Sequence, residues 1–309
     1  MNLGANNNSN SLLCIVGPTA SGKSALAVEV AERIGGEIVS CDSMQIYCGC
    51  DIVTAKATRA EREQIPHHLL DVADPSESFS AASWARLASE AIEDIEARGK
   101  TAIVCGGTGF YLRALLAPET LAVAPPNEQL RGELQAQWER DGKEVMHARL
   151  AELDCEAAVR LHPNDTHRVL RALEVALSPR AATPFELPTR SAWIWALSWP
   201  RKLLVARIDE RVEAMIAAGA IEETRALVEE FGEAAPALGS VGYKQLRAHL
   251  KGELAWGEAV EAWKIATRQY AKRQMTWFRG QTRAVWLDAT GTPDELVRAI
   301  WGNEDGTGA

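Results

Sequence analysis

The residues GPTASGKS, Gly17 to Ser24, have the spacing G-x-x-x-x-G-K-S of a phosphate-binding loop. An apolar run, Leu12–Val16, leads into them, and an amphipathic helical pattern begins at Lys23. In such a loop, consecutive backbone N–H groups and a helix N-terminus surround an anionic phosphate, while the lysine adds a point charge and the Ser24 hydroxyl can bind Mg²⁺. The motif does not fix the reaction, because kinases, NTPases and transferases share it. It predicts a polyphosphate ligand held by Gly17, Pro18, Thr19, Ala20, Ser21, Gly22, Lys23 and Ser24.

A carboxylate, Asp42, follows the second apolar run, Glu37–Ser40. Ligands of parallel α/β sheets sit outside the carboxyl ends of the strands, so Asp42 is expected to face the same crevice as Lys23. There it could act as a general base or bind Mg²⁺. The alternative is an aspartate that only caps a turn.

Weaker candidates surround this pair. Gly106-Gly107-Thr108-Gly109 follows the run Thr101–Cys105, and its backbone and the Thr108 hydroxyl could approach a ligand closely. The aromatic pair Trp277 and Phe278 could stack on bases, whereas core packing is the expectation for the tryptophans at 193, 195 and 199. A zinc site would have to come from Cys41, Cys48, Cys50, His67 and His68, whose C-x-C spacing is not that of zinc knuckles.

The elements that must position these residues alternate between strand and helix. Apolar runs typical of strands buried on both faces occur at 12–16, 37–40, 69–72, 101–105, 192–198 and 284–287, with helical patterns between most of them, such as 23–34 and 80–97. This order predicts a parallel sheet flanked by helices, that is, an α/β P-loop core. We expect the core to span residues 11–117 and 191–301.

The alternation stops between these two stretches. Residues 118–190 instead show helical apolar spacing, with Leu130, Leu134 and Trp138 at i, i+4 and i+8. In the same stretch Asp165 is expected to cap a helix. A helical insertion domain over 118–190 follows, and the polar ends 1–10 and 302–309 are expected to be flexible tails.

Composition excludes several classes of protein. With 47% hydrophobic and 24% charged residues the chain is not a disordered one. No apolar run approaches the ~18 residues of a membrane span, and the first residues lack the pattern of a signal peptide. Six scattered cysteines in a chain of 309 residues indicate reduced thiols, so we expect a cytoplasmic protein that does not contact membranes.

The net charge of −9 conceals one basic segment, Lys264–Arg283, which contains six Lys or Arg residues and no acid. At about 100° per residue, Lys264, Arg268, Lys272 and Arg279 form one stripe of a helix. The stripe could bind RNA phosphates or could be a solvated surface, and Arg268 or Arg273 could instead turn toward the ligand of the phosphate-binding loop.

Eight segments, in order, resemble the tRNA dimethylallyltransferase (tRNA isopentenyltransferase) family. The resemblance covers about Leu12 to Leu287 and rests on GPTASGKS, SCDSMQIY, DIVTAKAT, PHHLLDV, GGTGFYLRALL, HPNDTHRVLRALEV, SVGYKQL and TRQYAKRQMTWFR. It implies a P-loop core with a helical insertion that faces tRNA. It also implies transfer of a dimethylallyl group from dimethylallyl diphosphate to N6 of the adenosine 3′-adjacent to the anticodon, with release of diphosphate and with Mg²⁺ as cofactor.

The resemblance also implies roles for single residues. Asp42 matches the general base, Thr108 a residue of the reaction channel, and Arg211 an arginine that binds the diphosphate. Contact with tRNA is implied for the stretch 42–45, that is Asp42, Ser43, Met44 and Gln45, and for His167, Arg168, Val169, Leu170 and Arg171. Among the basic residues we add Lys264, Arg268, Lys272 and Arg273 from the charge pattern.

The segment after Asp42 departs from the family pattern. Val53 replaces the usual glycine and Ala57 the usual proline, while Cys48 and Cys50 replace a basic residue and a methionine. These differences concern the shape of a loop and none of the catalytic groups.

The sequence therefore predicts a monomeric, Mg²⁺-dependent enzyme that prenylates the anticodon stem-loop of tRNA. An adenine in that loop must be flipped out to reach the crevice. Three alternatives remain: a P-loop kinase of a nucleoside or metabolite, an isopentenyltransferase of free adenine nucleotides, and a nucleotide-dependent RNA-binding switch without transfer chemistry.

Overall fold

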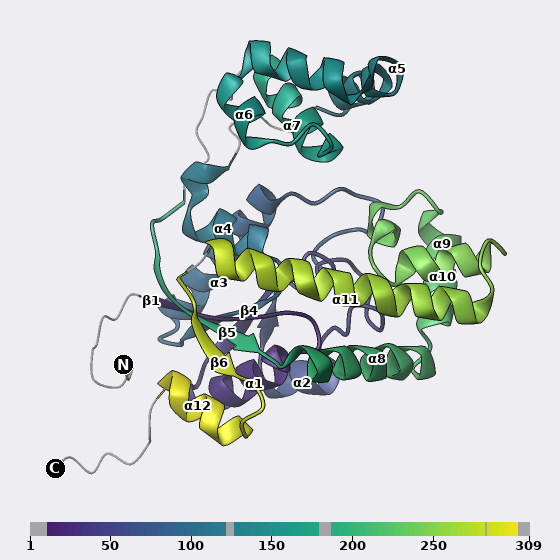
Figure 1. The fold of residues 1–309 in the computed structure, drawn as a ribbon. Helices are drawn as coiled ribbons and strands as arrows, with labels where there is room; N and C mark the ends of the chain where they lie inside the picture. The colour runs from purple at the N-terminus through teal and green to yellow at the C-terminus, as the bar shows by residue number, and fades with distance from the viewer. Residues whose placement is uncertain (1–10, 122–126, 179–186, 282, 302–309) are drawn as a thin grey trace. The chain divides into compact units, whose positions relative to one another are not determined.

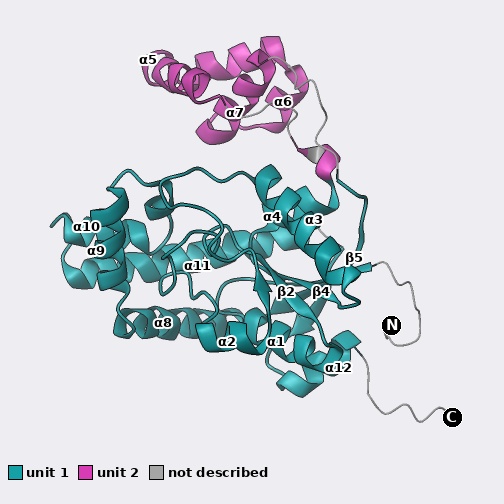
Figure 2. Cartoon of the chain, turned by 180° about the vertical axis from the view of Figure 1, so that it is seen from behind, with its two compact units in different colours: residues 1–117, 187–309 teal, residues 118–186 magenta. Residues whose placement is uncertain are grey.

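The computed structural model describes residues 11–121, 127–178, 187–281 and 283–301. They divide into two compact units, residues 1–117 with 187–309, and residues 118–186 (Figure 2). The tails expected at 1–10 and 302–309 lie outside the described residues.

The first unit is built on a six-stranded parallel sheet, which confirms the predicted α/β core (Figure 1). Its strand order is β3-β2-β4-β1-β5-β6. Since all strands run the same way, the segments after β1, β2 and β4 meet at one edge of the sheet. The strands are β1 (Ser11–Val16), β2 (Glu37–Cys41), β3 (His67–His68), β4 (Ala102–Gly106), β5 (Ser191–Ser198) and β6 (Val285–Asp288).

The strand expected at 69–72 is wrong. The chain pairs with β2 two residues earlier, through His67 and His68, and then turns away. Leu69 and Asp71 have φ of 63° and 56°, a left-handed conformation that a strand does not allow. The Asp71 carboxylate fixes the turn by binding the buried ammonium of Lys56 at 2.5 Å and the guanidinium of Arg62 at 2.7 Å.

Helices cover both faces of the sheet. One face carries α1 (Lys23–Ile34) and α12 (Pro293–Trp301), which pack on each other, and the other carries α3 (Ala81–Ala97) and α4 (Gly109–Leu116) (Figure 1). A short helix, α2 (Arg59–Gln64), precedes β3. Trp195 is buried, and Trp193 and Trp199 pack against the same core, which confirms core packing for this tryptophan series.

The chain after β5 is mainly helical. It forms α8 (Arg201–Ala217), α9 (Ala220–Phe231), α10 (Tyr243–Leu250) and the long α11 (Trp256–Gln281). Helix α11 contacts α8, α10 and α4, so it runs from the additional helices to the edge of the core that carries Thr108, the N-cap of α4 (Figure 1).

The second unit is helical, as predicted for the insertion. It contains α5 (Glu128–Leu153), which is kinked at Gly142, together with α6 (Cys155–Arg160) and α7 (Thr166–Leu177). The expected cap is confirmed, because the Asp165 side chain accepts a hydrogen bond from the N–H of Arg168. Leu134, Leu150 and Leu173 belong to its own hydrophobic core. No helix among the described residues of the chain is long and apolar enough to cross a membrane.

A buried carboxylate, Glu37, stabilises the start of β2. It is 1% exposed and accepts hydrogen bonds from both terminal nitrogens of Arg98 (2.5 and 2.8 Å), from Lys100 (2.7 Å) and from His68 (2.7 Å). The hydrogen bonds from Arg98 hold the pKa of Glu37 far below its usual range, although burial opposes this. The ion pairs are far from Asp42, at the other end of the strand.

We expect Glu37→Gln to lower the free energy of unfolding at pH 7 by about 2–4 kcal/mol, because a buried carboxylate paired with two cations, Arg98 and Lys100, is lost. Because the pKa of Glu37 is lower in the folded state than its ordinary value of 4.5, the ionised carboxylate stabilises the fold fully at pH values above 4.5. This stabilisation decreases below pH 4.5 and is lost as the pH falls through the lowered pKa. Urea unfolding of both proteins from pH 7 to pH 3 checks this. If the difference in unfolding free energy between the two proteins stayed constant from pH 7 to pH 3, the stabilising role of the Glu37 carboxylate would be contradicted.

Candidate active site

The phosphate-binding loop connects β1 to α1, as predicted. Gly22 is the N-cap of α1, with φ of 89°, and has no side chain to occupy the first N–H groups of the helix. Those N–H groups and the positive end of the helix dipole therefore face the loop. Two side chains after β5 hold the loop from outside: Trp199 Nε1 donates to the Ser21 carbonyl at 2.9 Å and Arg207 Nε to that of Ala20 at 2.9 Å.

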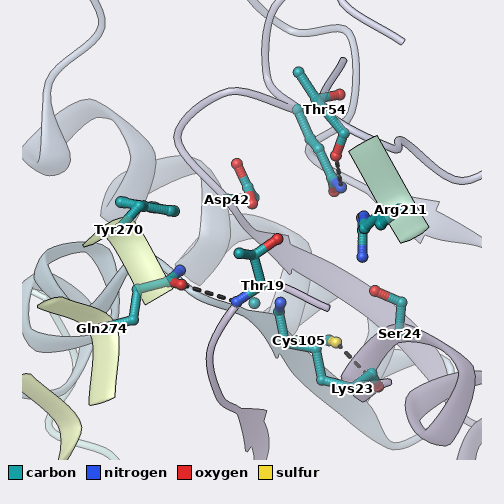
Figure 3. A pocket seen from close by; sticks show the side chains of 11 residues that line it. Thr19, Lys23, Ser24, Asp42, Thr54, Cys105, Arg211, Tyr270 and Gln274 are labelled. Atoms are coloured by element: carbon teal, nitrogen blue, oxygen red, sulfur yellow. Dashed lines mark hydrogen bonds between the residues drawn. The ribbon is translucent and has the colours of Figure 1, made fainter. Parts of the chain in front are cut away.

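A small polar cavity of about 50 Å³ lies above this loop (Figure 3). Lys23 and Arg211 both line it, the first from α1 and the second from α8, together with one carboxylate, Asp42. Burial lowers the pKa of both Lys23 and Arg211, while the nearby Asp42 raises both. Two cations with one carboxylate leave an excess of positive charge in a partly desolvated space, which suits an anionic ligand. The remaining lining residues are Thr19, Ser24, Gln45, Thr54, Cys105, Gly106, Tyr270 and Gln274.

Asp42 lies at the carboxyl end of β2, where the sequence placed it. One of its carboxylate oxygens, Oδ1, accepts a hydrogen bond from the Met44 N–H at 2.9 Å, so Asp42 does stabilise a turn. The same side chain lines the cavity opposite Lys23 (Figure 3). The turn hydrogen bond therefore orients a carboxylate that also faces the cavity, and the role of Asp42 as general base stays a prediction.

Thr108 joins the neighbouring strand to this turn. It follows β4 as the N-cap of α4, and its hydroxyl accepts a hydrogen bond from the Ser43 N–H at 2.9 Å. The structure therefore brings Asp42 and Thr108 together, because β2 and β4 are adjacent in the sheet.

Gly107 and Gly109, on either side of Thr108, have a packing reason, while Gly106 of the same turn lines the smaller cavity. A Cβ on Gly107 would lie 2.2 Å from the Gln274 side chain, and one on Gly109 would lie 2.1 Å from the ring of Trp277. Both clashing side chains belong to α11. The glycines allow α11 to pack closely against this turn, with the ring of Trp277 beside Gly109.

A second, larger cavity of about 320 Å³ adjoins the first. Thr19, Asp42, Thr54, Arg211 and Tyr270 line both. The larger cavity is mainly apolar, with α8, α11 and the segment 239–241 as its other walls; their apolar side chains are Ile208, Val212, Met215, Val241 and Trp263. Asp42 therefore lies where a charged compartment meets an apolar one.

The loop after Asp42 forms part of this wall. The Gln45 amide donates to the carbonyls of Thr54 and Ala55 at 3.2 Å each and accepts from the Ser40 hydroxyl at 3.0 Å, so it is engaged within the loop. Val53, which departs from the family pattern, is 8% exposed and lines the larger cavity. Its side chain narrows a space that a glycine would leave open.

The basic stripe of α11 is partly neutralised. Two of its cations pair with acids of α8: Lys264 with Glu213 at 2.5 Å, and Arg268 with Asp209 at 2.6 Å. These acids lie outside the segment Lys264–Arg283, so a charge count of that segment does not include them. Arg273 lines the larger cavity, and its guanidinium lies 5.8 Å from the ring of Tyr270. Within the described part of the chain, Lys272 is exposed and makes no ion pair. Contact of these four side chains with RNA stays a prediction.

The segment 167–171 of α7 belongs to the second unit. Val169 and Leu170 are buried in its core, at 0% and 7% exposure, so their side chains cannot contact tRNA as the resemblance suggested. His167 and Arg168 are exposed, and Arg171 is half-buried. Side-chain contacts of this segment with RNA would therefore come from His167, Arg168 and Arg171.

Sequence reasoning did not find Tyr270, Gln274, Thr54 or Cys105 as residues of the site. Tyr270 and Gln274 had one usable signal, because they are four apart in TRQYAKRQ and so share a face of a helix. Burial raises the pKa of Tyr270 strongly, while a hydrogen bond with the Thr108 side chain lowers it.

A zinc site is not supported. All six cysteines are free, and the described residues contain no cluster of three or more His, Cys, Asp or Glu side chains suited to a metal. A hard cation prefers oxygen ligands, and Ser24 and Asp42 are among the oxygen-bearing side chains that line the smaller cavity.

Comparison with known proteins gives consistent matches. The family model described as IPP transferase matches residues 45–281. A protein of Anaeromyxobacter dehalogenans named tRNA dimethylallyltransferase is 48% identical over 94% of this chain and 98% of its own length. One of the same name from Geobacter metallireducens is 46% identical over 94% and 96%.

Two solved structures are also similar. The full-length tRNA isopentenylpyrophosphate transferase of Bacillus halodurans has a TM-score of 0.70 and 37% identity, covering 94% of both chains. A eukaryotic dimethylallyltransferase, described in crystallographic snapshots as acting on tRNA, has a TM-score of 0.75 and 29% identity, covering 91% of this chain and 74% of that one.

Proposed function

The chain belongs to the IPP transferase family and transfers a dimethylallyl group to tRNA, and we propose that the donor is dimethylallyl diphosphate and the acceptor is N6 of the adenosine 3′-adjacent to the anticodon. The observation that carries this proposal is the pair of adjoining cavities with Asp42 at their junction. The charged cavity suits the diphosphate. The larger, apolar one suits the prenyl chain and a flipped-out adenine.

The chemistry of the proposed reaction explains the charges. The adenine amine is a poor nucleophile, because its lone pair is delocalised into the ring, so the allylic C–O bond must break readily. As it breaks, negative charge moves onto the diphosphate, where Lys23, Arg211 and the loop N–H groups stabilise it. The new bond joins the amine nitrogen to the allylic carbon, diphosphate leaves, and Asp42 takes the proton that the nitrogen releases.

The residues present fit a magnesium ion. Mg²⁺ prefers oxygen ligands, keeps several waters, and needs only one or two protein groups beside substrate phosphates. Ser24 lines the charged cavity and would hold the ion there together with oxygens of the diphosphate, which leaves Asp42 to act as the base. When bound, it would neutralise charge on the diphosphate.

For the tRNA we propose two contact surfaces, described separately because they belong to different units. One is on α7, with the exposed His167 and Arg168 and the half-buried Arg171, and the other is the basic face of α11, above all Lys272 and Arg273. Such cations would bind the RNA backbone rather than single bases. A tRNA substrate also agrees with the cytoplasmic location that the free cysteines suggested.

The proposal predicts which acceptor is labelled. With labelled dimethylallyl diphosphate and Mg²⁺, we expect label in unmodified tRNA at the adenosine next to the anticodon and none in free AMP. Nuclease digestion and chromatography of the nucleosides locate the label. Label in AMP alone would favour an enzyme that acts on free nucleotides. Transfer of phosphate from ATP would favour a kinase. Binding of tRNA without any label in it would favour an RNA-binding switch.

A further inference from the structure

A buried glutamine of α11, Gln274, ties together the two loops that form the charged cavity. It is 5% exposed, and both ends of its amide are used. Its Oε1 accepts a hydrogen bond from the Thr19 N–H at 2.8 Å (Figure 3). Its Nε2 donates to the Gly107 carbonyl at 3.0 Å. Thr19 belongs to the phosphate-binding loop after β1 and Gly107 to the turn after β4. One side chain from a third segment thus connects both.

The contact is closely fitted rather than incidental. Gly107 leaves the space that the amide occupies, since a Cβ there would lie 2.2 Å from Gln274 Nε2. Two helical turns of α11 also contribute to the site, because Tyr270, four residues earlier, lines both cavities. A buried amide with both hydrogen-bonding groups satisfied holds its partners in one arrangement.

Thr19 is the residue through which this contact reaches the chemistry. It lines both cavities, and Figure 3 shows it between Asp42 and Lys23. Fixing its backbone N–H fixes the direction of its side chain and of the neighbouring loop N–H groups. Small displacements of such groups weaken both ligand binding and the alignment of reacting atoms.

We propose that Gln274 is a positioning residue of the transfer reaction, which holds Thr19 and the phosphate-binding loop in the arrangement that binds diphosphate. The inference rests on the proposed function, since it takes diphosphate as the ligand of the charged cavity. It also gives α11 a second role beside RNA contact. The helix that carries Lys272 and Arg273 is connected through Gln274 to the loop that binds the leaving group.

Two substitutions of Gln274 test this role. Gln274→Met keeps the length of the side chain and removes both hydrogen bonds. We expect the Kd for inorganic diphosphate, measured by calorimetry, to rise about tenfold, and the single-turnover transfer rate at saturating substrates to fall about 10–100-fold. Gln274→Glu keeps an acceptor for the Thr19 N–H but adds negative charge and cannot donate to Gly107, so diphosphate binding should weaken further.

The matched control is Glu37→Gln, which also replaces a buried polar side chain but at the opposite end of β2. It should lower the melting temperature and leave the Kd for diphosphate and the transfer rate unchanged below that temperature. If Gln274→Met behaves like this control, its role is purely structural and the inference is overturned. Tighter diphosphate binding would also overturn it, because Gln274 would then compete with the ligand for Thr19.

The diphosphate titration separates this inference from the proposed function, because it needs neither tRNA nor transfer. Wild-type affinity in both variants would overturn the role of Gln274 alone. Absence of diphosphate binding in the wild-type protein would overturn the proposed donor, and with it this inference.

Discussion

Replacing Asp42 by asparagine is expected to lower the single-turnover transfer rate about 10²–10⁴-fold, while the Kd for tRNA changes less than about threefold. Asparagine keeps an oxygen that can accept the Met44 N–H bond, so the turn is preserved. It cannot take the proton that the amine releases. Transfer of labelled dimethylallyl diphosphate and filter binding of tRNA measure the two quantities.

A second turn aspartate supplies the control. Asp288 likewise accepts a hydrogen bond from the N–H two residues ahead, that of Thr290, at 3.0 Å, but it is exposed and lines neither cavity. Asp288→Asn should leave the rate unchanged. If Asp42→Asn transfers at the wild-type rate, Asp42 acts only in the turn, and if tRNA binding collapses with it, the assignment as general base is wrong.

The core of the fold was predictable because its signals are local. Five apolar runs became β1, β2, β4, β5 and β6 within one residue at each end, and Lys23–Ile34 is a helix with the expected bounds. The run Leu69–Val72 failed because its turn depends on Asp71 binding Lys56 and Arg62. An ion pair with a buried lysine 15 residues away leaves no local pattern.

The site likewise has some residues that local sequence patterns predict and others that depend on contacts between distant segments. The phosphate-binding loop and Asp42 follow from short motifs and from the rule that parallel strands present ligands at one edge. Gln274 is separated from Thr19 by 255 residues, and its contact exists only because α11 packs on the core. The net charge around α11 could not be judged from its own residues for a related reason, since the acids that pair with Lys264 and Arg268 come from α8.

A charged cavity built for an anion costs stability when no anion is bound, and Lys23→Met should reveal this cost. Burial lowers the pKa of Lys23, and the nearby Arg211 lowers it further, against the influence of Cys105 and Asp42. Because its ordinary pKa of 10.5 lies above that of the folded state, ionised Lys23 opposes folding, and this opposition disappears as the pH rises between the two values. We therefore expect the ligand-free variant to melt no lower than the wild-type protein at pH 7.

The same substitution should greatly reduce function. Without the ammonium group, charge on the leaving diphosphate is stabilised less, so the single-turnover transfer rate should fall about 10²–10³-fold. Saturating inorganic diphosphate should raise the melting temperature of the wild-type protein clearly more than that of the variant, because a ligand stabilises the folded state according to its affinity. Lys251→Met, at a surface ion pair with Glu233, is the control and should change neither the rate nor the shift. A Lys23→Met protein that melts well below wild type yet binds diphosphate equally well would show that Lys23 supports the fold and not the leaving group.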